Sequence, residues 1–415
     1  MSRTFEETHP WISFTINLGK FTPELWLLLG EGRSKCEHLA GAPLRPETAR
    51  KLHMVYLAKG IQGTTAIEGN TLSEQQVEAI IEGKLKMPPS KEYLEQEVKN
   101  ILVGCDTIWT LVSNHKRLNI TPEIIRSFNK MVLNGLKLEE GAQAGEVRNH
   151  NVGVFRYRGA PPEDCEYLLG KLCSWLAEAE GALPDYMGRV GKAIVLAAVA
   201  HLYIAWIHPF GDGNGRTARL LEFAILLEAG VPTPAAHLLS NHYNVTRTEY
   251  YRQLDYASKS GGEIVPFIYY ATQGFVDSLR EQIRTVREQQ LDVVWRNYVF
   301  EKFKDQEDSA AQRRCKHLIL DLASKREFVP RKDLMTLSTR LVRHYQGKGE
   351  RTLARDLNSL RQLGLLARDA KRGYRAKREV IEAFLPGVKT DETEEVLPSP
   401  SDAPSATSHA TGPVN

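Results

Sequence analysis

The segment from His208 to Arg219 constrains this chain more than any other, because it places a dense group of polar residues between two apolar helical patterns. Residues Gly188 to Ile207 carry apolar side chains at helical spacing, and Pro209 ends that pattern. Residues Thr217 to Ala229 again indicate a helix. The sequence therefore predicts a short polar connection between two helices.

Three glycines within five positions of this connection favour an anion-binding loop. Gly211, Gly213 and Gly215 let successive backbone N–H groups turn inward at the start of the next helix. The alternative is a glycine-rich surface turn that only caps a helix and leaves its arginines in solvent. We favour the anion site because a base, a carboxylate, an amide and two arginines coincide at close spacing.

Each polar side chain of the segment suits nucleotide chemistry. The imidazole of His208 can remove a proton near neutral pH. Asp212 can hold a magnesium ion together with phosphate oxygens. Arg216 and Arg219 lie three residues apart on one helix face and can bind phosphates bidentately, and Asn214 can donate to a further phosphate oxygen.

The segment resembles the Fic family signature H-x-F-x-[D/E]-G-N-G-R-x-x-R at every fixed position. The resemblance implies a mainly α-helical fold and transfer of AMP from ATP to a Ser, Thr or Tyr hydroxyl of a target protein or of the chain itself. It also implies a role for each residue: His208 is the base, Asp212 the Mg²⁺ ligand, Phe210 a core anchor, Gly211, Gly213, Asn214 and Gly215 the phosphate cradle, and Arg216 and Arg219 the phosphate-binding pair, with Arg219 at the γ-phosphate.

A second resemblance lies upstream, where Thr64 to Asn70 match the Fic inhibitory motif [S/T]-x-x-x-E-[G/N]. Its position resembles the class whose inhibitory helix precedes the catalytic core. This implies that Glu68 pairs with Arg219 and restrains the enzyme. The alternative makes Glu68 a plain carboxylate at a helix end. Ser73 and Glu74 predict the start of another helix directly afterwards.

Two segments flank the predicted site. Residues Gly145 to Gly159 are rich in β-forming residues, which predicts a hairpin, and they resemble the Fic flap that pairs with an extended target by strand addition. The alternative is an ordinary connecting hairpin. Tyr250 and Tyr251 resemble the segment that closes over adenine, but Thr246 stands where many members have Asn, so both tyrosines could be core residues. We expect His201 to pack in the core.

The C-terminal part is basic. Residues 309–379 contain 19 Lys and Arg against 7 Asp and Glu, a net charge of +12 in a chain of net charge +3. Three helical patterns followed by a short strand pair resemble a winged helix-turn-helix domain, with Arg351, Arg355, Asn358 and Arg361 presented to DNA. The alternative is a protein-interaction module with a solvated basic face.

The predicted organisation has five parts: an N-terminal helical region at 1–115, a catalytic core at 116–285, a helical linker at 286–308, a winged helix at 309–382 and a disordered tail at 383–415.

Five cysteines without metal-ligand spacing, and no apolar run of about 18 residues, favour a soluble cytoplasmic protein without a membrane segment. We expect ATP and Mg²⁺ to bind, a protein as substrate, DNA as a possible partner and a homodimer as a possible assembly. The alternative functions are a DNA-binding regulator that senses nucleotide, and a Fic enzyme that removes AMP or uses another nucleotide.

Overall fold

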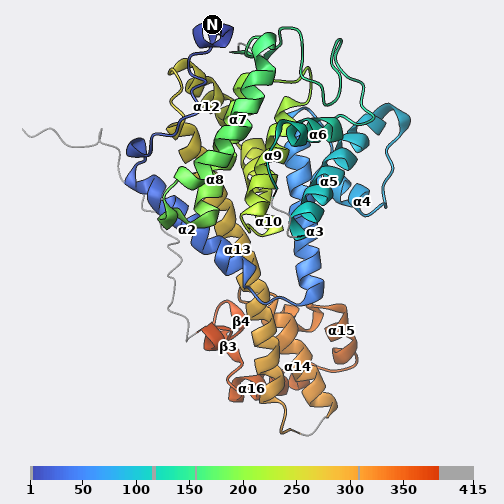
Figure 1. Cartoon of the computed structure of the whole chain (residues 1–415). Coiled ribbons are helices and arrows are strands. Elements are labelled where there is room, and N and C mark those ends of the chain that lie inside the picture. Colours follow the sequence, from blue (N-terminus) through green and yellow to red (C-terminus); the bar gives the residue numbers. More distant parts are fainter. Residues whose placement is uncertain (1–2, 115–117, 155–156, 307–308, 383–415) are drawn as a thin grey trace, which may run out of the picture. The chain divides into compact units, whose positions relative to one another are not determined.

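The computed structural model describes residues 3–114, 118–154, 157–306 and 309–382, and these residues are mainly helical (Figure 1). The chain divides into two compact units, Met1–Gln290 and Leu291–Asn415. The predicted helical class is confirmed. The predicted tail at 383–415 lies outside the described residues, as do residues 116–117 of the predicted core.

The first unit is built mainly from helices, with one short hairpin. Its elements in chain order are α1 (Thr4–Thr8), η1 (Leu18–Lys20), α2 (Pro23–Ala40), α3 (Pro46–Ile67), α4 (Glu74–Ile81), η2 (Pro89–Lys91), α5 (Glu92–Ser113), α6 (Pro122–Val132), β1 (Gly153–Val154), β2 (Tyr157–Arg158), α7 (Pro162–Ala182), η3 (Asp185–Met187), α8 (Gly188–Ile207), α9 (Asn214–Glu228), α10 (Thr233–Ala236), α11 (Leu238–Val245), α12 (Arg247–Lys259) and α13 (Val265–Lys302), of which α13 continues into the second unit.

Helix α8 lies at the centre of the hydrophobic core of this unit. Its side chains are buried on all sides, including Ile194, Tyr203 and Ile207, because it packs against α2, α7 and α9 (Figure 1). Among the described residues, one segment, Asp185–Ile207, is long and apolar enough to span a membrane, and 89% of its most apolar window is buried in the protein. A helix that is apolar all round is what a core position requires.

Helix α3 reaches its position through two glycines. A Cβ atom on Gly60 would lie 2.4 Å from Cγ of His237, and one on Gly63 would lie 2.9 Å from Oδ1 of Asn241. Only a residue without a side chain permits this close approach of α3 to α10 and α11. The packing places the end of α3, and with it Glu68, against the start of α9.

The second unit has its own hydrophobic core. Its elements after α13 are α14 (Ala310–Ala323), η4 (Arg331–Thr336), α15 (Thr339–Tyr345), α16 (Glu350–Gln362), β3 (Leu366–Asp369), β4 (Gly373–Ala376) and α17 (Glu379–Glu382). Strands β3 and β4 are antiparallel, and Val329 adds a bridge to Tyr374. The core includes Trp295 of α13, Leu318 and Leu357. Within this unit, the buried guanidinium of Arg314 donates to both carboxylate oxygens of Asp356, and the Tyr345 hydroxyl donates to one of them.

Several boundaries differ from those expected. Helix α9 begins at Asn214 rather than Thr217, because Gly213 adopts the left-handed conformation just before it. Helix α13 runs from the predicted core to Lys302, within the stretch expected to be a helical linker at 286–308. The predicted hairpin is confined to β1 and β2, and residues 155–156 between them lie outside the described residues. The domain boundaries at 115 and 285 stay predictions. All five cysteines are free and buried.

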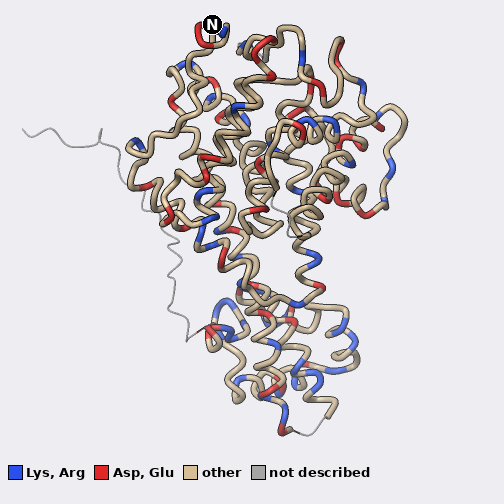
Figure 2. Tube along the Cα trace, viewed as in Figure 1, with Lys and Arg blue, Asp and Glu red and all other residues tan. Residues whose placement is uncertain are grey.

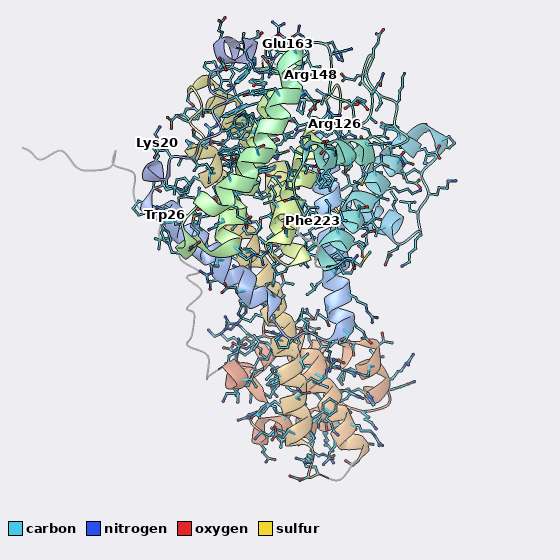
Figure 3. All side chains as sticks on the ribbon, viewed as in Figure 1. Lys20, Trp26, Arg126, Arg148, Glu163 and Phe223 are labelled. Atoms are coloured by element: carbon cyan, nitrogen blue, oxygen red, sulfur yellow. The ribbon has the colours of Figure 1, made fainter. Side chains whose placement is uncertain are left out.

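Replacing Gly60 by Ala tests the packing of α3. The new methyl group would overlap the buried imidazole of His237, which stacks on Phe223 at 4.5 Å (labelled in Figure 3). Overpacking of this kind outweighs the helix propensity of Ala, so we expect the free energy of unfolding to fall by about 1–2 kcal/mol in urea titrations.

Gly30→Ala is the matched control, because Gly30 lies inside α2 and a Cβ there meets nothing within 4 Å. This variant should gain about 0.5–1 kcal/mol. Equal effects of the two substitutions would contradict the close approach of α3.

Candidate active site

Six residues, 208–213, connect α8 to α9, and both ends of this connection are left-handed. His208 has φ of 50° and ends α8, and Gly213 has φ of 75° and precedes α9. Glycine is required at position 213, because a Cβ there would lie 2.9 Å from Leu133. A histidine in this conformation is strained and needs support from its surroundings.

Arg148 supplies that support. Its buried guanidinium donates to four backbone carbonyls: His208 at 2.6 Å, His150 at 2.6 Å, Ala160 at 2.5 Å and Ile207 at 3.3 Å (labelled in Figure 3). These bonds join the end of α8 to the chain before α7. Sequence reasoning placed Arg148 in the hairpin and missed this role, since the carbonyls of Ile207 and His208 lie about 60 residues further along the chain.

Two asparagines brace the connection from inside. The Asn214 side chain accepts from Phe210 N at 2.9 Å and donates to Phe210 O at 2.8 Å, so it holds the loop, and its expected contact with phosphate stays a prediction. Phe210 itself is fully buried, as expected of a core anchor. Asn129 of α6 donates to Asp212 O at 2.9 Å and accepts from Gly145 N at 2.9 Å, a role that no sequence pattern indicated.

The connection opens on a cavity of about 760 Å³. The residues that line it include most of the predicted site: His208, Gly211, Asp212, Gly213, Asn214, Gly215, Tyr250, Tyr251 and Glu68. Arg216 and Arg219 do not line it, but both are buried and bond lining residues, Asp212 and Glu68 respectively. The structure therefore places a base and a glycine-rich loop around one space large enough for a small ligand, with two guanidinium groups bonded to its lining.

Arg219 is bound to the end of α3. Its Nη2 donates to Oε1 of Glu68 at 2.6 Å, and its Nε donates to Oγ1 of Thr64 at 2.7 Å. A Cβ on Gly215 would lie 2.3 Å from the same Glu68 oxygen, so the carboxylate occupies space that this glycine leaves open. Desolvation raises the pKa of Glu68, but the bond and charge of Arg219, together with Arg216 and His208, outweigh it, and the pKa lies below its usual value. Glu68 is therefore an anion on Arg219.

Arg216 has two acidic partners. Nη1 donates to Oε1 of Glu97 at 2.8 Å and Nη2 to Oδ1 of Asp212 at 3.3 Å. The other oxygen of Glu97 accepts from Nδ2 of Asn70 at 2.8 Å. Burial, together with the nearby carboxylates, raises the pKa of Glu97 although Arg216 and Asn70 oppose this. Glu97 lies on α5, where its sequence context resembles an ordinary helix surface, and it was not predicted.

The aromatic side of the cavity is formed by α12. Tyr250 is buried, stacks on Tyr243 at 4.8 Å and bonds Nε2 of His201 at 2.8 Å. Tyr251 is only half-buried, and Arg247 lies over its ring. His201 itself is fully buried, as expected of a core residue. Thr246 is bonded within the protein to His242 O and the Tyr270 hydroxyl.

The short hairpin borders the same cavity. Val152, Gly153 and Tyr157 line it, and the Tyr157 hydroxyl donates to Trp206 O at 2.8 Å. Carbonyl O of Arg158 bonds the imidazole of His9 at 2.9 Å, which ties β2 to the N-terminal segment. The hairpin is thus held at the mouth of the site by contacts from two sides.

Comparison with known proteins supports the resemblance seen in the sequence. Residues 119–226 match the model of the Fic/DOC family. The protein adenylyltransferase Fic of Nematostella vectensis is 33% identical over 216 residues, which are 51% of this chain and 45% of that protein. The protein adenylyltransferase fic-1 of Caenorhabditis elegans is 28% identical over 261 residues, 61% of this chain and 46% of that protein. The chain spans less than half the length of these two relatives.

Solved structures show the same fold. A Fic family protein from Desulfovibrio desulfuricans G20 aligns with a TM-score of 0.53 at 23% identity, covering 86% of this chain and 97% of that one. Residues 134–508 of Fic-1 from C. elegans align with a TM-score of 0.51 at 25% identity, covering 63% and 72%. This chain therefore contains a Fic domain, as its motif predicts.

The environment of His208 predicts how it titrates. Burial, together with the nearby Arg148 guanidinium, lowers the pKa of His208 to about 4, against small opposing effects that include Glu68. In the ligand-free protein the ring should stay neutral from pH 7.5 to about pH 5, whereas an ordinary histidine would be mostly protonated at pH 5. NMR of the His208 ring resonances, assigned with His208→Asn, measures this.

The exposed side chain of His38 is a suitable reference within the same spectra. Because the unfolded chain binds a proton on His208 near pH 6.5 and the folded chain does not, stability should fall as the pH drops from about 6.5 towards 4. A titration of His208 with a midpoint near 6.5 would contradict the buried environment.

Proposed function

We propose that this protein is an adenylyltransferase that moves AMP from ATP to a Ser, Thr or Tyr hydroxyl of a target protein or of itself. The observation that supports this most is the joint lining of one cavity by His208 and the glycine loop, with Arg216 and Arg219 bonded to lining residues. The curated relatives, which are named protein adenylyltransferases, point the same way.

The reaction needs a base and a site for the leaving group. His208, neutral at physiological pH, accepts the proton of the target hydroxyl, and the hydroxyl oxygen forms a bond to the α-phosphorus of ATP. The bond between that phosphorus and the bridging oxygen breaks, and pyrophosphate leaves. Backbone N–H groups at the start of α9 and the two arginines hold the phosphates during this exchange.

Asp212 fits the role of magnesium ligand. Its carboxylate lines the cavity and keeps 23% of its surface exposed, and Oδ1 already accepts from Arg216. No bond to Oδ2 is found among the described residues. A carboxylate oxygen facing phosphates is the ligand type that Mg²⁺ prefers, and the ion would neutralise charge on the phosphates.

Glu68 restrains this activity in our proposal. It occupies the guanidinium that the γ-phosphate needs, in the space left by Gly215. With Glu68 in place the triphosphate cannot settle with its α-phosphate in line for attack, although ATP can still enter in another pose. The same site could act on another nucleotide or remove AMP from a modified protein.

The second unit suggests a further candidate function, DNA binding. The order α14, an isolated bridge at Val329, η4 with α15, α16, β3 and β4 resembles that of a winged helix-turn-helix domain, which supports this candidate. Arg351, Arg355, Asn358 and Arg361 form one exposed face of α16, and Lys and Arg are dense throughout this unit (Figure 2). A regulator that senses nucleotide through its Fic domain would use this face.

Labelling tests the proposed reaction. With Mg²⁺ and ATP labelled at the α-phosphate, Glu68→Gly should label itself or added proteins about 5-fold to 150-fold faster than the parent, because Arg219 is released. Adding His208→Ala to Glu68→Gly should reduce the rate by about 10²-fold to 10⁴-fold, and adding Arg219→Ala should also abolish the gain. Labelled GTP, CTP and UTP serve as competitors.

Glu82→Gly is the matched control for Glu68→Gly. Like Glu68, Glu82 ends a helix, directly before a glycine with positive φ, but it pairs only with exposed Lys84. Its removal should leave the rate of the parent unchanged. Equal rates for the parent and Glu68→Gly would show that Glu68 is not the restraint, and transfer that survives His208→Ala would reject the base.

Fluorescence anisotropy with duplex DNA tests the second unit. Binding should weaken steeply as salt rises, and Arg351→Ala, Arg355→Ala and Arg361→Ala together should lower the slope of log K against log salt by about 3. Lys84→Ala, Lys86→Ala and Lys91→Ala remove the same charge from exposed positions of the first unit and should change the slope little. No binding at low salt would favour a protein-interaction module.

A further inference from the structure

Arg216 lies between two carboxylates that come from different elements. Asp212 belongs to the loop before α9, whereas Glu97 comes from α5, more than a hundred residues earlier in the chain. The Arg216 side chain is only 8% exposed and that of Glu97 only 13%. The shorter bond is the one to Glu97, at 2.8 Å against 3.3 Å for Asp212.

We propose that Glu97 is a positioning residue of the nucleotide site, which holds Arg216 so that the Asp212 carboxylate stays available for magnesium. This inference rests on the proposed function, because it assumes that Asp212 meets a metal-bound nucleotide. It gives Glu97 no contact with the nucleotide or the metal. Glu97 would affect the metal only by orienting the guanidinium group of Arg216.

Competition for Arg216 is the physical basis. A buried guanidinium needs carboxylate or carbonyl acceptors, and Asp212 and Glu97 are the acids that bond it among the described residues. Without Glu97 the planar donor pair of Arg216 would turn to Asp212 and bind both of its oxygens. Those oxygens are the ones that Mg²⁺ requires, so the metal would have to displace an ion pair before binding.

Glu97 is itself held in place. Oε2 accepts from Asn70 Nδ2, and Asn70 also donates to Leu94 O at 3.0 Å and accepts from Leu72 N at 3.0 Å. Both oxygens of Glu97 are therefore engaged, which suits a residue that orients a neighbour. A side chain meant to bind the metal itself would leave an oxygen unbonded.

The alternative role is purely structural. Glu97 could stabilise the packing of α5 on α9 by satisfying a buried arginine, with no influence on magnesium. In that case its loss would lower the stability of the folded protein and leave the magnesium requirement for ATP binding as it was. The dependence of ATP binding on Mg²⁺ concentration distinguishes the two roles.

The experiment uses the full chain with Glu68→Gly, so that Arg219 is free. ATP binding is measured by calorimetry over a range of Mg²⁺ concentrations for this protein and for the same protein carrying Glu97→Gln or Glu97→Ala. We expect Glu97→Ala to raise the Mg²⁺ concentration for half-maximal binding by about 10-fold to 100-fold. Glu97→Gln keeps an acceptor for Arg216 without the charge and should give a smaller rise.

Glu92→Gln is the control, since Glu92 is exposed on the first turn of the same helix. It should leave the Mg²⁺ dependence unchanged. Thermal unfolding without ATP or Mg²⁺ shows which variants are folded. If Glu97→Ala is not folded, the comparison is made with Glu97→Gln. An unchanged Mg²⁺ dependence in a folded Glu97 variant would overturn the proposal.

The proposed reaction and the role of Glu97 fail in different ways. If Glu68→Gly transfers no label, the proposed function is rejected, while the calorimetric comparison still decides the role of Glu97. If Glu68→Gly binds ATP equally well with and without Mg²⁺, no metal depends on Asp212, and the role of Glu97 is rejected as well.

Discussion

The connection between α8 and α9 is the constraint on which the rest of the site depends. Helix α8 is buried on every side, so the backbone that leaves it cannot rely on water for its hydrogen bonds. Arg148 binds the carbonyls at the end of α8, and Asn214 and Asn129 bond the loop that follows. With these partners the loop keeps the N–H groups at the start of α9 clear for an anion.

The site also depends on the charge balance of its buried arginines. Two buried arginines stand beside the loop, and each needs an anion when no ligand is bound. Glu68 supplies one for Arg219, while Asp212 and Glu97 supply two for Arg216. The resting protein thus pairs both arginines with its own carboxylates, which stand where phosphate oxygens would lie in the reaction that we propose. The short stretch from Thr64 to Asn70 contacts both arginines, directly at Arg219 and through Glu97 at Arg216.

The sequence predicts the residues of this site that lie close together in the chain. His208, Asp212 and the two arginines could be found because one loop and one helix turn carry them all. Glu68 could be found from a short motif, and its partner Arg219 followed from the resemblance. Asn214 was expected to bind phosphate, and this stays a prediction; its two bonds to the backbone of Phe210 were not foreseen, because a side-chain amide can bond phosphate or backbone and only the folded loop shows the second contact.

Arg148, Asn129 and Glu97 could not be found in this way. Each acts on groups 60 or more residues away, such as the carbonyl of His208 or the guanidinium of Arg216, and no local spacing records such a contact. The helical class was predictable because apolar periodicity is local. The close approach of α3 to its neighbours was not predictable, since a glycine within a helix does not indicate which other helix packs against it.

Gly215 has a consequence for how the site responds to its surroundings. The space beside this glycine can hold the Glu68 carboxylate or a phosphate, but not both. Glu68 is tethered by the chain, so its effective concentration at Arg219 is set by the geometry of α3 and stays constant while cellular nucleotide levels change. In the restraint that we propose, a shift of α3 that moves this carboxylate away from Arg219 would lower its effective concentration there and favour the nucleotide at any given ATP level.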